Sequence, residues 1–348
     1  MAGSVVFIVP GPIDQRTGGY IYDRRIVLGL RARGRWVEVV ELPGRFPFAD
    51  ATARAAALRC VEGLAAGALP VIDGLALPAF ARVLDRLPPW VALIHHPLGM
   101  ETGLGESEAR ALLDLEREML RAPARIVVTG PQTVRDLERL DVAPARVAVV
   151  RPGTDPAPLA RGSGGPARHM LCVASLTPRK GHPVLLEALA GLVDLDWRLT
   201  CVGSPDLHPP TAAAIRAALE ERGLGERVAL VGERPAAELA PFYDAADLFV
   251  LASHHEGYGM ALGEALARGL PVVTTRAGAI PDTVPATAGL LVPPGDPAAL
   301  AGALRRVLTD GGLRRRLAEG ARAARAALPS WDEAVAAFAA ELGRLPAT

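Results

Sequence analysis

Short runs of apolar and β-branched residues alternate along the chain with longer stretches rich in Ala, Leu and Arg. Continuous apolar runs are typical of strands in a parallel sheet that is buried on both faces, and the stretches between them have helical character. The first half contains six runs, at 5–10, 36–42, 69–73, 90–95, 125–130 and 146–153. The second half also contains six, at 169–175, 197–203, 227–232, 247–253, 270–275 and 288–296. The pattern predicts an α/β protein with two doubly wound, Rossmann-like domains of similar size.

The boundary between these domains is marked by a change in composition. Residues 152–168 are dense in Pro, Gly and Ser, as linkers are. We therefore predict an N-terminal domain at 1–155, a linker at 156–168 and a C-terminal domain at 169–329. Ligands of open α/β sheets bind outside the carboxyl ends of the strands. We expect the two domains to face each other across a cleft, lined by the residues that follow the strands.

The segment 330–348 reads as one more helix. Ser330 is a suitable N-cap, and apolar residues recur at Trp331, Val335, Phe338 and Leu342. These spacings place the four side chains on one helix face, which must pack against something. We expect this helix to return to the N-terminal domain.

Composition and charge exclude several classes of protein. Half of the 348 residues are hydrophobic and the formal net charge is zero, which argues against a nucleic-acid-binding protein. The three cysteines, Cys60, Cys172 and Cys201, lack metal-ligand or redox spacing, so we expect buried free thiols and a cytoplasmic location. We expect neither a signal peptide nor a membrane-spanning helix, because the first apolar run is short and no basic region precedes it.

The segment "LTPRKGH" holds Lys180, the only lysine in a chain whose other basic residues are all arginine. A lysine is a compact point charge on a flexible stem, well suited to reaching between phosphate oxygens. Chance survival of one lysine in an Arg-rich chain is the alternative.

The segment "EGYGMALGE", which follows the run 247–253, combines two glutamates with a glycine turn and a helix start. Gly257 and Gly259 let backbone N–H groups approach a ligand, and a helix N-terminus favours a phosphate or a developing anion. Glu256 beside the turn can accept hydrogen bonds from sugar hydroxyls, and Glu264 can bind the two hydroxyls of a ribose. Alternatively, Glu256 is an ordinary N-terminal helix acid and Glu264 a solvated one.

These segments resemble retaining, nucleotide-sugar glycosyltransferases of the GT-B fold. "EGYGMALGE" is similar to the E-x7-E signature of that family, and "LTPRKGHPVLLEAL" to its phosphate-binding segment. "TGGYIYDRRIVLGLRARGRWVEVVEL", "VVRPGTD", "YDAADLFVLAS" and "LVPPGDPAALAGAL" match further family segments in the same order, so the resemblance covers nearly the whole chain.

The resemblance implies specific roles for individual residues. Lys180 would be half of an Arg–Lys clamp on the donor diphosphate, with Arg179 as the nearest substitute for the clamp arginine, because Ser175 stands at the arginine position. Glu256 would contact the transferred sugar. The implied donor-binding residues are Gly18, Gly19, Ser175, Arg179, Glu233, Gly257, Tyr258, Gly259, Met260 and Glu264.

A histidine pair, His95-His96, ends the run 90–95. The family often has a histidine here, near the anomeric centre, and we take His95 as the functional member and His96 as the alternate. Adjacent residues on a strand point to opposite faces and no third ligand accompanies the pair, so we predict no metal. The "DLD" at 194–196 is an ordinary acidic turn.

The implied reaction is transfer of a glycosyl group, with retention, from a nucleoside diphosphate sugar, with UDP-sugar favoured and no cofactor. A small-molecule acceptor is favoured over a lipid, although the arginines between 24 and 35 would suit a membrane surface. The same fold could instead support a glycosyl phosphorylase or a hydrolysing nucleotide-sugar epimerase. An alternative of another class is a catalytically silent GT-B domain that binds a nucleotide or a partner.

Overall fold

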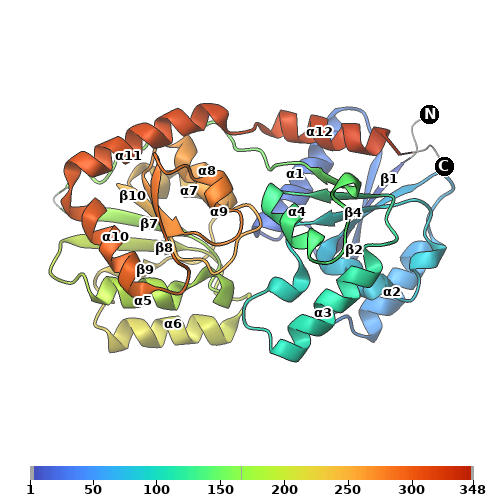
Figure 1. The fold of residues 1–348 in the computed structure, drawn as a ribbon, viewed down its shortest axis with the longest axis horizontal. Helices are drawn as coiled ribbons and strands as arrows, with labels where there is room; N and C mark the ends of the chain where they lie inside the picture. The colour runs from blue at the N-terminus through green and yellow to red at the C-terminus, as the bar shows by residue number, and fades with distance from the viewer. Residues whose placement is uncertain (1–3, 166, 346–348) are drawn as a thin grey trace. The chain divides into compact units, whose positions relative to one another are not determined.

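The computed structural model describes residues 4–165 and 167–345, and the chain divides into two compact units (Figure 1). Unit 1 contains the described residues up to Gly153 and those from Pro329 onward, whereas unit 2 is Thr154–Leu328. Each unit is built on one six-stranded sheet in which all strand pairs are parallel. The prediction of two Rossmann-like α/β domains is confirmed.

Unit 1 has the strand order β2-β1-β3-β4-β5-β6. Its strands are β1 (Val5–Pro10), β2 (Val37–Leu42), β3 (Leu69–Asp73), β4 (Val91–Ile94), β5 (Arg125–Val128) and β6 (Val147–Val149). Its α-helices are α1 (Gly18–Ala32), α2 (Ala51–Glu62), α3 (Glu106–Met119), α4 (Pro131–Glu138) and α12 (Trp331–Gly343). All six predicted strands of this half are present.

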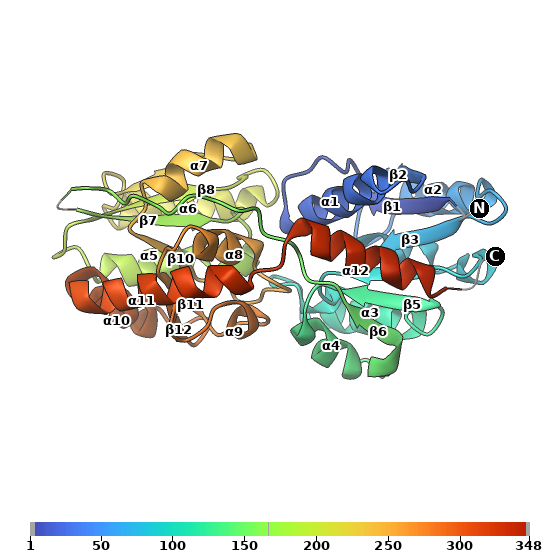
Figure 2. The ribbon, with the colours of Figure 1, turned by 90° about the horizontal axis from the view of Figure 1, so that it is seen from above.

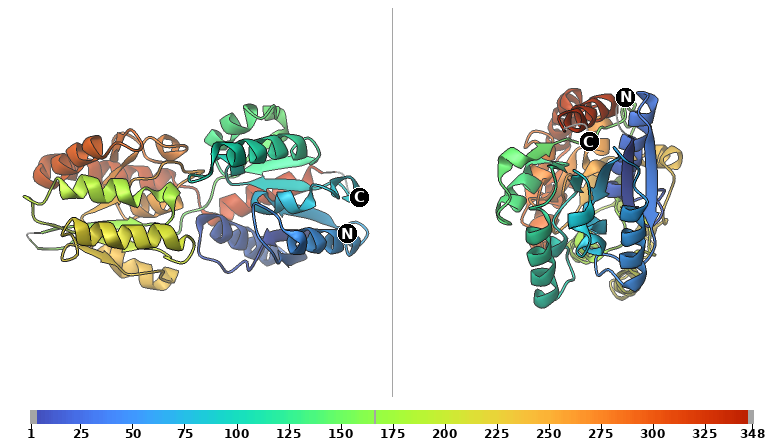
Figure 3. Two further views of the ribbon diagram at one scale, coloured as in Figure 1. Left: turned by 90° about the horizontal axis from the view of Figure 1, so that it is seen from below. Right: turned by 90° about the vertical axis from the view of Figure 1, so that its right-hand side faces the viewer.

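Unit 2 has the strand order β12-β11-β10-β7-β8-β9. Its strands are β7 (Arg168–Val173), β8 (Trp197–Val202), β9 (Val228–Leu230), β10 (Leu248–Leu251), β11 (Val272–Thr275) and β12 (Gly289–Val292). Its α-helices are α5 (His182–Ala190), α6 (Pro209–Glu221), α7 (Ala236–Asp244), α8 (Met260–Ala267), α9 (Ile280–Thr283), α10 (Pro297–Thr309) and α11 (Gly311–Ala324). Helices α5 and α6 lie side by side on the sheet, as Figure 3 shows, and α10 packs against α5.

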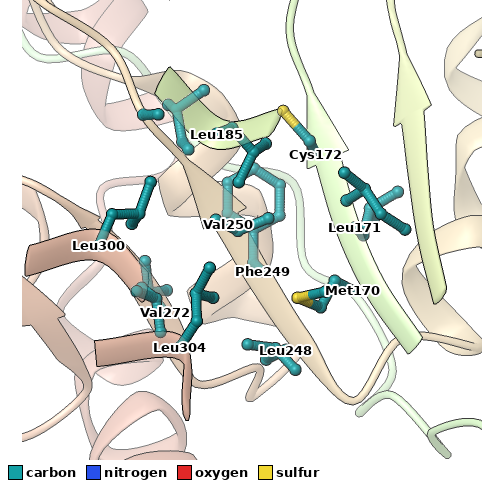
Figure 4. Packing of buried hydrophobic residues seen from close by; sticks show 14 of the residues in the cluster. Met170, Leu171, Cys172, Leu185, Leu248, Phe249, Val250, Val272, Leu300 and Leu304 are labelled. Carbon is teal, nitrogen blue, oxygen red and sulfur yellow. The ribbon is translucent and has the colours of Figure 1, made fainter. Parts of the chain in front are cut away.

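The apolar runs are continuous because both faces of each sheet are buried. In β1, Val5, Phe7 and Val9 belong to the cluster beneath α1 and α12, whereas Val6 and Ile8 belong to the cluster on the opposite face. The buried apolar residues of unit 2 form one contiguous cluster, with Leu171, Phe249 and Leu300 among its fully buried members (Figure 4).

The helix α12 completes unit 1, where it packs against α1 (Figure 2). Ser330 caps it through a capping box with Glu333, and Val335, Phe338 and Leu342 are buried in the unit 1 core, as the sequence pattern indicates. Its close approach to α1 depends on Gly29, because a Cβ at this position would lie 2.3 Å from Val335 Cγ2.

The strand orders identify where each sheet should bind ligands. The order of connection reverses between β1 and β3 in unit 1 and between β7 and β10 in unit 2. Ligands of doubly wound sheets bind at such switch points, beyond the carboxyl ends of the strands. The segments after β1 and β3, and those after β7 and β10, are therefore the places to look for sites.

Candidate functional site

Two loops of unit 2 meet at the switch point between β7 and β10. The first continues from β7 into the short 3₁₀ helix η5 (Pro178–Lys180), and the second, after β10, carries Glu256. The His254 N–H donates to the Arg179 carbonyl at 2.8 Å, which joins the loops directly.

Gly181 allows this meeting. Its φ is +66°, a left-handed conformation that side chains disfavour, and a Cβ here would lie 2.0 Å from the Ala252 carbonyl oxygen. The residue also precedes α5, which begins at His182. A glycine is therefore required where the Lys180 loop turns into the helix.

Glu256 is the centre of the site because three side chains converge on its carboxylate. Lys180 Nζ donates to Oε1 at 2.6 Å, Ser253 Oγ donates to the same oxygen at 2.6 Å, and Arg179 Nη1 lies 3.4 Å from Oε2. Glu256 is only 4% exposed. Burial alone would disfavour its charge, but Lys180 and Arg179 outweigh that penalty and lower the pKa of Glu256 to about 2. The site thus pairs a fixed carboxylate with two cations.

The second glutamate of the signature lies on α8, where Tyr243 orients it. The hydroxyl of Tyr243 donates to Glu264 Oε2 at 2.8 Å, and the Arg268 guanidinium lies over the Tyr243 ring at 4.2 Å from its centroid. Burial and the Glu264 charge hold the pKa of Tyr243 well above its usual range, so the hydroxyl keeps its proton. Glu264 itself is half-buried.

A cavity of about 220 Å³ lies at the carboxyl ends of β7, β8 and β9. It is lined by Leu176, Cys201, Gly203, Pro205, Arg216, Leu230, Val231 and Gly232. Its lining combines apolar side chains, backbone and the Arg216 side chain, as small-molecule pockets commonly do. A larger cavity of about 680 Å³ along the edge strand β12 shares no residue with it.

The other predicted donor residues of unit 2 are distributed around these loops. Ser175 is half-buried just after β7, Glu233 is half-buried after β9, and Gly257, Tyr258 and Gly259 join Glu256 to Met260, the first residue of α8. The Tyr258 carbonyl accepts a hydrogen bond from Thr283 Oγ1 at 2.8 Å, which fixes the turn. The structure therefore brings Lys180, Arg179 and Glu256 together. Glu264 lies in α8, the helix that begins just after the Glu256 loop.

A second polar cluster lies at the switch point of unit 1. His95 Nε2 is 3.1 Å from Asp23 Oδ1 and 3.2 Å from Asp73 Oδ2. Asp23 comes from α1 and Asp73 is the last residue of β3. Both carboxyl groups are buried, and the second oxygen of Asp23, Oδ2, has no hydrogen-bond partner among the described residues.

The charges of this cluster are strongly coupled. Burial lowers the pKa of His95, but the charges and hydrogen bonds of Asp23 and Asp73 outweigh it and raise the value to about 10. Burial, aided by the Asp73 charge, raises the pKa of Asp23 to about 7 in spite of the attraction to His95. The two carboxyl groups therefore favour the protonated form of His95.

Gly18 and Gly19 form the first turn of α1 rather than a loop before it. The resemblance implies that backbone at these glycines approaches the donor, and the structure places there the N–H groups of a helix start. A Cβ at residue 19 would lie 3.2 Å from His95 Cδ2, so this turn also packs against the histidine. His96 pairs instead with Glu101, whose Oε2 lies 3.2 Å from Nε2.

The three cysteines are free, and two are buried as expected, but the structure changes what their spacing implied. Cys172 and Cys201 are directly paired residues of β7 and β8, and His182 at the start of α5 reaches them. The two thiols and the imidazole offer ligand atoms within 4.8 Å of one another. Sequence spacing cannot reveal such a cluster, because strand pairing creates it.

Four residues of these clusters were missed by the sequence patterns: Asp23, Asp73, Tyr243 and Ser253. Asp73 and Ser253 end predicted strands, so the rule that sites lie after strands could have identified them. Tyr243 and Asp23 lie inside helices, and nothing in their spacing distinguishes them from core or surface residues.

Residues 161–324 match the model of the family described as Glycosyl transferases group 1. The D-inositol 3-phosphate glycosyltransferase of Corynebacterium jeikeium is 31% identical over 276 residues, which are 72% of this chain and 65% of that protein. Residues 161–324 of this chain belong to the group 1 glycosyltransferases. The D-inositol 3-phosphate glycosyltransferase of Corynebacterium glutamicum is 34% identical over 235 residues, which are 62% of this chain and 56% of that protein. The group 1 relatives first matched are longer, and this chain spans a little over half of their length.

Solved structures show the same two-domain GT-B fold as this group 1 chain. Sucrose-phosphate synthase from Thermosynechococcus elongatus has a TM-score of 0.83 at 24% identity and covers 98% of both chains. Anabaena HepE, solved in complex with UDP-glucose, has a TM-score of 0.80 at 17% identity, over 99% of this chain and 100% of the other. In the described part of this group 1 chain, no helix is both long and apolar enough to cross a bilayer.

Proposed function

We propose that the protein is a retaining glycosyltransferase that uses a nucleoside diphosphate sugar, with a UDP-sugar favoured, and a small-molecule acceptor. The observation that carries this proposal is the convergence of Lys180 and Arg179 on Glu256 at the switch point of unit 2. The combination supplies two cations for a diphosphate and one carboxylate for sugar hydroxyls.

The chemistry follows from the charges. A departing nucleoside diphosphate develops negative charge, and preorganised cations and N–H groups stabilise that charge in the transition state. Lys180 and Arg179 would supply the cations, with Arg179 replacing the arginine that is missing at Ser175. The helix start at Gly259 and Met260 would supply N–H groups. Because these groups would stabilise the negative charge on the leaving diphosphate, the proposed reaction requires no metal ion.

The nucleotide would occupy the rest of the unit 2 edge. Glu264, oriented by Tyr243, would accept hydrogen bonds from the two hydroxyls of a ribose, and the 220 Å³ cavity beyond β8 and β9 would hold the base. Retention is attributed to attack from the same face as departure, with the leaving phosphate accepting the acceptor proton, as the resemblance implies. The free cysteines suit a reducing cytoplasm.

The relatives support the acceptor class. The names of the curated relatives specify D-inositol 3-phosphate, a small polar molecule, and a solved neighbour of the same fold was crystallised with UDP-glucose. Both facts concern those proteins, and we extend them to this chain as the class of donor and acceptor to test first.

The test is a screen of UDP-, GDP- and ADP-sugars with polyol and sugar-phosphate acceptors, read by product mass and by the anomeric proton coupling of the product. The expected result is transfer from a UDP-sugar with the donor's anomeric configuration, lost in Lys180→Ala. An inverted product would refute retention. Nucleotide binding without turnover would favour a silent binding domain, and phosphate-dependent cleavage or release of an epimerised free sugar would favour the phosphorylase or the hydrolysing epimerase.

A further inference from the structure

Asp23, Asp73 and His95 form a cluster of ionisable side chains in the interior of unit 1, where apolar residues are usual. Two carboxyl groups and an imidazole are costly to bury, and apolar side chains of similar volume would stabilise the core at least as well. Such clusters at the carboxyl ends of strands are typical of functional sites. His95 follows a predicted strand, but the two aspartates have no role in the proposed transfer so far.

Among the described residues, the two carboxyl groups engage only one nitrogen of the imidazole. Both carboxylates approach the same ring nitrogen, Nε2, at 3.1 and 3.2 Å. The other nitrogen, Nδ1, lies on the far side of the ring from them. The imidazole is 20% exposed, whereas the carboxyl groups are 1% and 7% exposed, so the ring is the part of the cluster most open to solvent.

The ring is also held in place by its neighbours. Tyr22 contacts it edge-on, with ring centroids 5.5 Å apart at 83°, and the Tyr22 hydroxyl is anchored on the Val150 carbonyl at 3.0 Å. On another side Gly19 packs closely, since a Cβ there would lie 3.2 Å from His95 Cδ2. The imidazole therefore has a fixed orientation as well as a fixed partner set.

Among the described residues, Asp23 and Tyr22 of α1 and Asp73 of β3 contact His95, and Tyr20 of α1 interacts with both acids. Burial raises the pKa of both tyrosines, so they remain neutral. The facing negative charge therefore comes from the two carboxyl groups, and it stabilises a second proton on the ring.

We propose that Asp23 and Asp73 are positioning residues that keep His95 doubly protonated, so that it serves the transfer reaction only as a hydrogen-bond donor and never as a base. This proposal rests on the proposed function for its role in catalysis. The ligand atom it fits is a neutral hydroxyl oxygen rather than a phosphate, because the two acids beside the ring disfavour an approaching anion.

The first test is independent of any transfer activity. The Cε1–H signals of the seven histidines are followed by NMR from pH 5.5 to 9.5 in the full chain, with His95 assigned from a His95→Gln variant. The expected His95 signal stays at the imidazolium position through pH 9 in the wild type. In Asp23→Asn and Asp73→Asn, its midpoint should fall by about two units or more. Asp136→Asn, a buried aspartate of α4 that pairs with Arg139, is the matched control and should leave it unchanged.

A wild-type midpoint near 6.5, or an equal shift in the control, would overturn the proposal. Broadening of the His95 signal by substoichiometric Mn²⁺ would do so too, because it would make the cluster a cation site. Folding of each variant is checked from the dispersion of the same spectra.

The second test uses the transfer reaction. In the wild type, deprotonation of His95 should not lower kcat/KM at any pH below 9. Asp73→Asn should lose activity as pH rises above about 7 and lower kcat about twofold at pH 8 and about tenfold at pH 9, with the KM for the donor nearly unchanged. A uniform loss at every pH would indicate a merely structural role and contradict the proposal. Absence of transfer by the wild type, with the expected NMR result, would refute the proposed function but not the protonation state of His95.

Discussion

Lys180 Nζ lies 2.6 Å from Glu256 Oε1, so the only lysine of the chain and the first glutamate of the E-x7-E segment form one buried ion pair. The two residues are 76 positions apart and come from loops that follow different strands. The carboxylate contacts the ammonium directly, so a diphosphate bound as proposed would compete with Glu256 for Lys180. Such a donor would change the surroundings of both residues at once.

The first prediction concerns the charge at position 180. Lys180→Ala should lower kcat/KM about 30- to 1000-fold, which corresponds to about 2–4 kcal/mol of transition-state stabilisation, because it removes a charge-assisted contact to the leaving group. Lys180→Arg should also lose substantial activity, since the larger guanidinium requires fork geometry in a space shared with Arg179 and Ser253. Steady-state kinetics measure both variants, and near-normal kcat/KM for the arginine variant would show that charge alone is needed.

The second prediction separates the two glutamates. Glu264→Ala should weaken binding of UDP, which contains the ribose but no sugar to transfer, whereas Glu256→Ala should lower turnover more than affinity. Tyr243→Phe removes the hydroxyl that orients Glu264 and should weaken UDP binding by a smaller factor, with no matching change for Glu256. Isothermal titration with UDP measures all three, and equal losses for both glutamate variants would contradict the assigned roles.

The third prediction isolates the close contact at Gly181. Gly181→Ala should cost about 3 kcal/mol or more of unfolding free energy, because the Cβ would meet the Ala252 carbonyl in addition to adopting a left-handed conformation. Gly223→Ala is the control, since Gly223 has nearly the same φ, +62°, with no atom within 4 Å of a built Cβ. It should cost only about 1–2 kcal/mol. Urea denaturation gives both values, and similar losses would mean that the contact is relieved by a small shift.

The fourth prediction uses a buried carboxyl group of α3. Glu116 is 1% exposed and Oε2 accepts the Leu98 N–H at 2.7 Å, while burial raises its pKa from 4.5 to about 7. A raised carboxyl pKa favours the folded state below pH 4.5, and this contribution is lost as pH rises through 7. Glu116→Gln should therefore change stability little at pH 4.5 but stabilise the protein by about 2–3 kcal/mol at pH 8. Urea denaturation at both pH values tests this, and a difference that does not vary with pH would contradict it.

The sequence predicts the elements better than the contacts between them. All twelve strands follow from continuous apolar runs, because strands buried on both faces have no polar positions to interrupt the pattern. The helix α12 follows from Ser330 and the spacing of Val335, Phe338 and Leu342. These signals are local, so one stretch of sequence is sufficient to read each of them.

The polar clusters depend on which strands are neighbours, and that information is not local. His95 was selected for its place after a strand, but its partners Asp23 and Asp73 become visible only when β1, β3 and β4 are ordered in the sheet. Likewise, Cys172 and Cys201 are 29 positions apart in the sequence, and only the register of β7 and β8 shows that they are neighbours. The loss of the clamp arginine at Ser175 left the second cation undetermined, and only the geometry places Arg179 beside Lys180 on Glu256.

The position of α12 has a consequence for biosynthesis. Phe7, Tyr22 and Ile26 share their core cluster with Val335 and Phe338, yet the ribosome must translate all of unit 2, residues 154–328, before it makes those partners. At ordinary synthesis rates this delay is on the order of ten to thirty seconds. During that time unit 2 can complete its own core, while the sheet face of unit 1 that awaits α12 stays open to solvent and to chaperones. The domain that is translated first is therefore expected to be the last to finish folding.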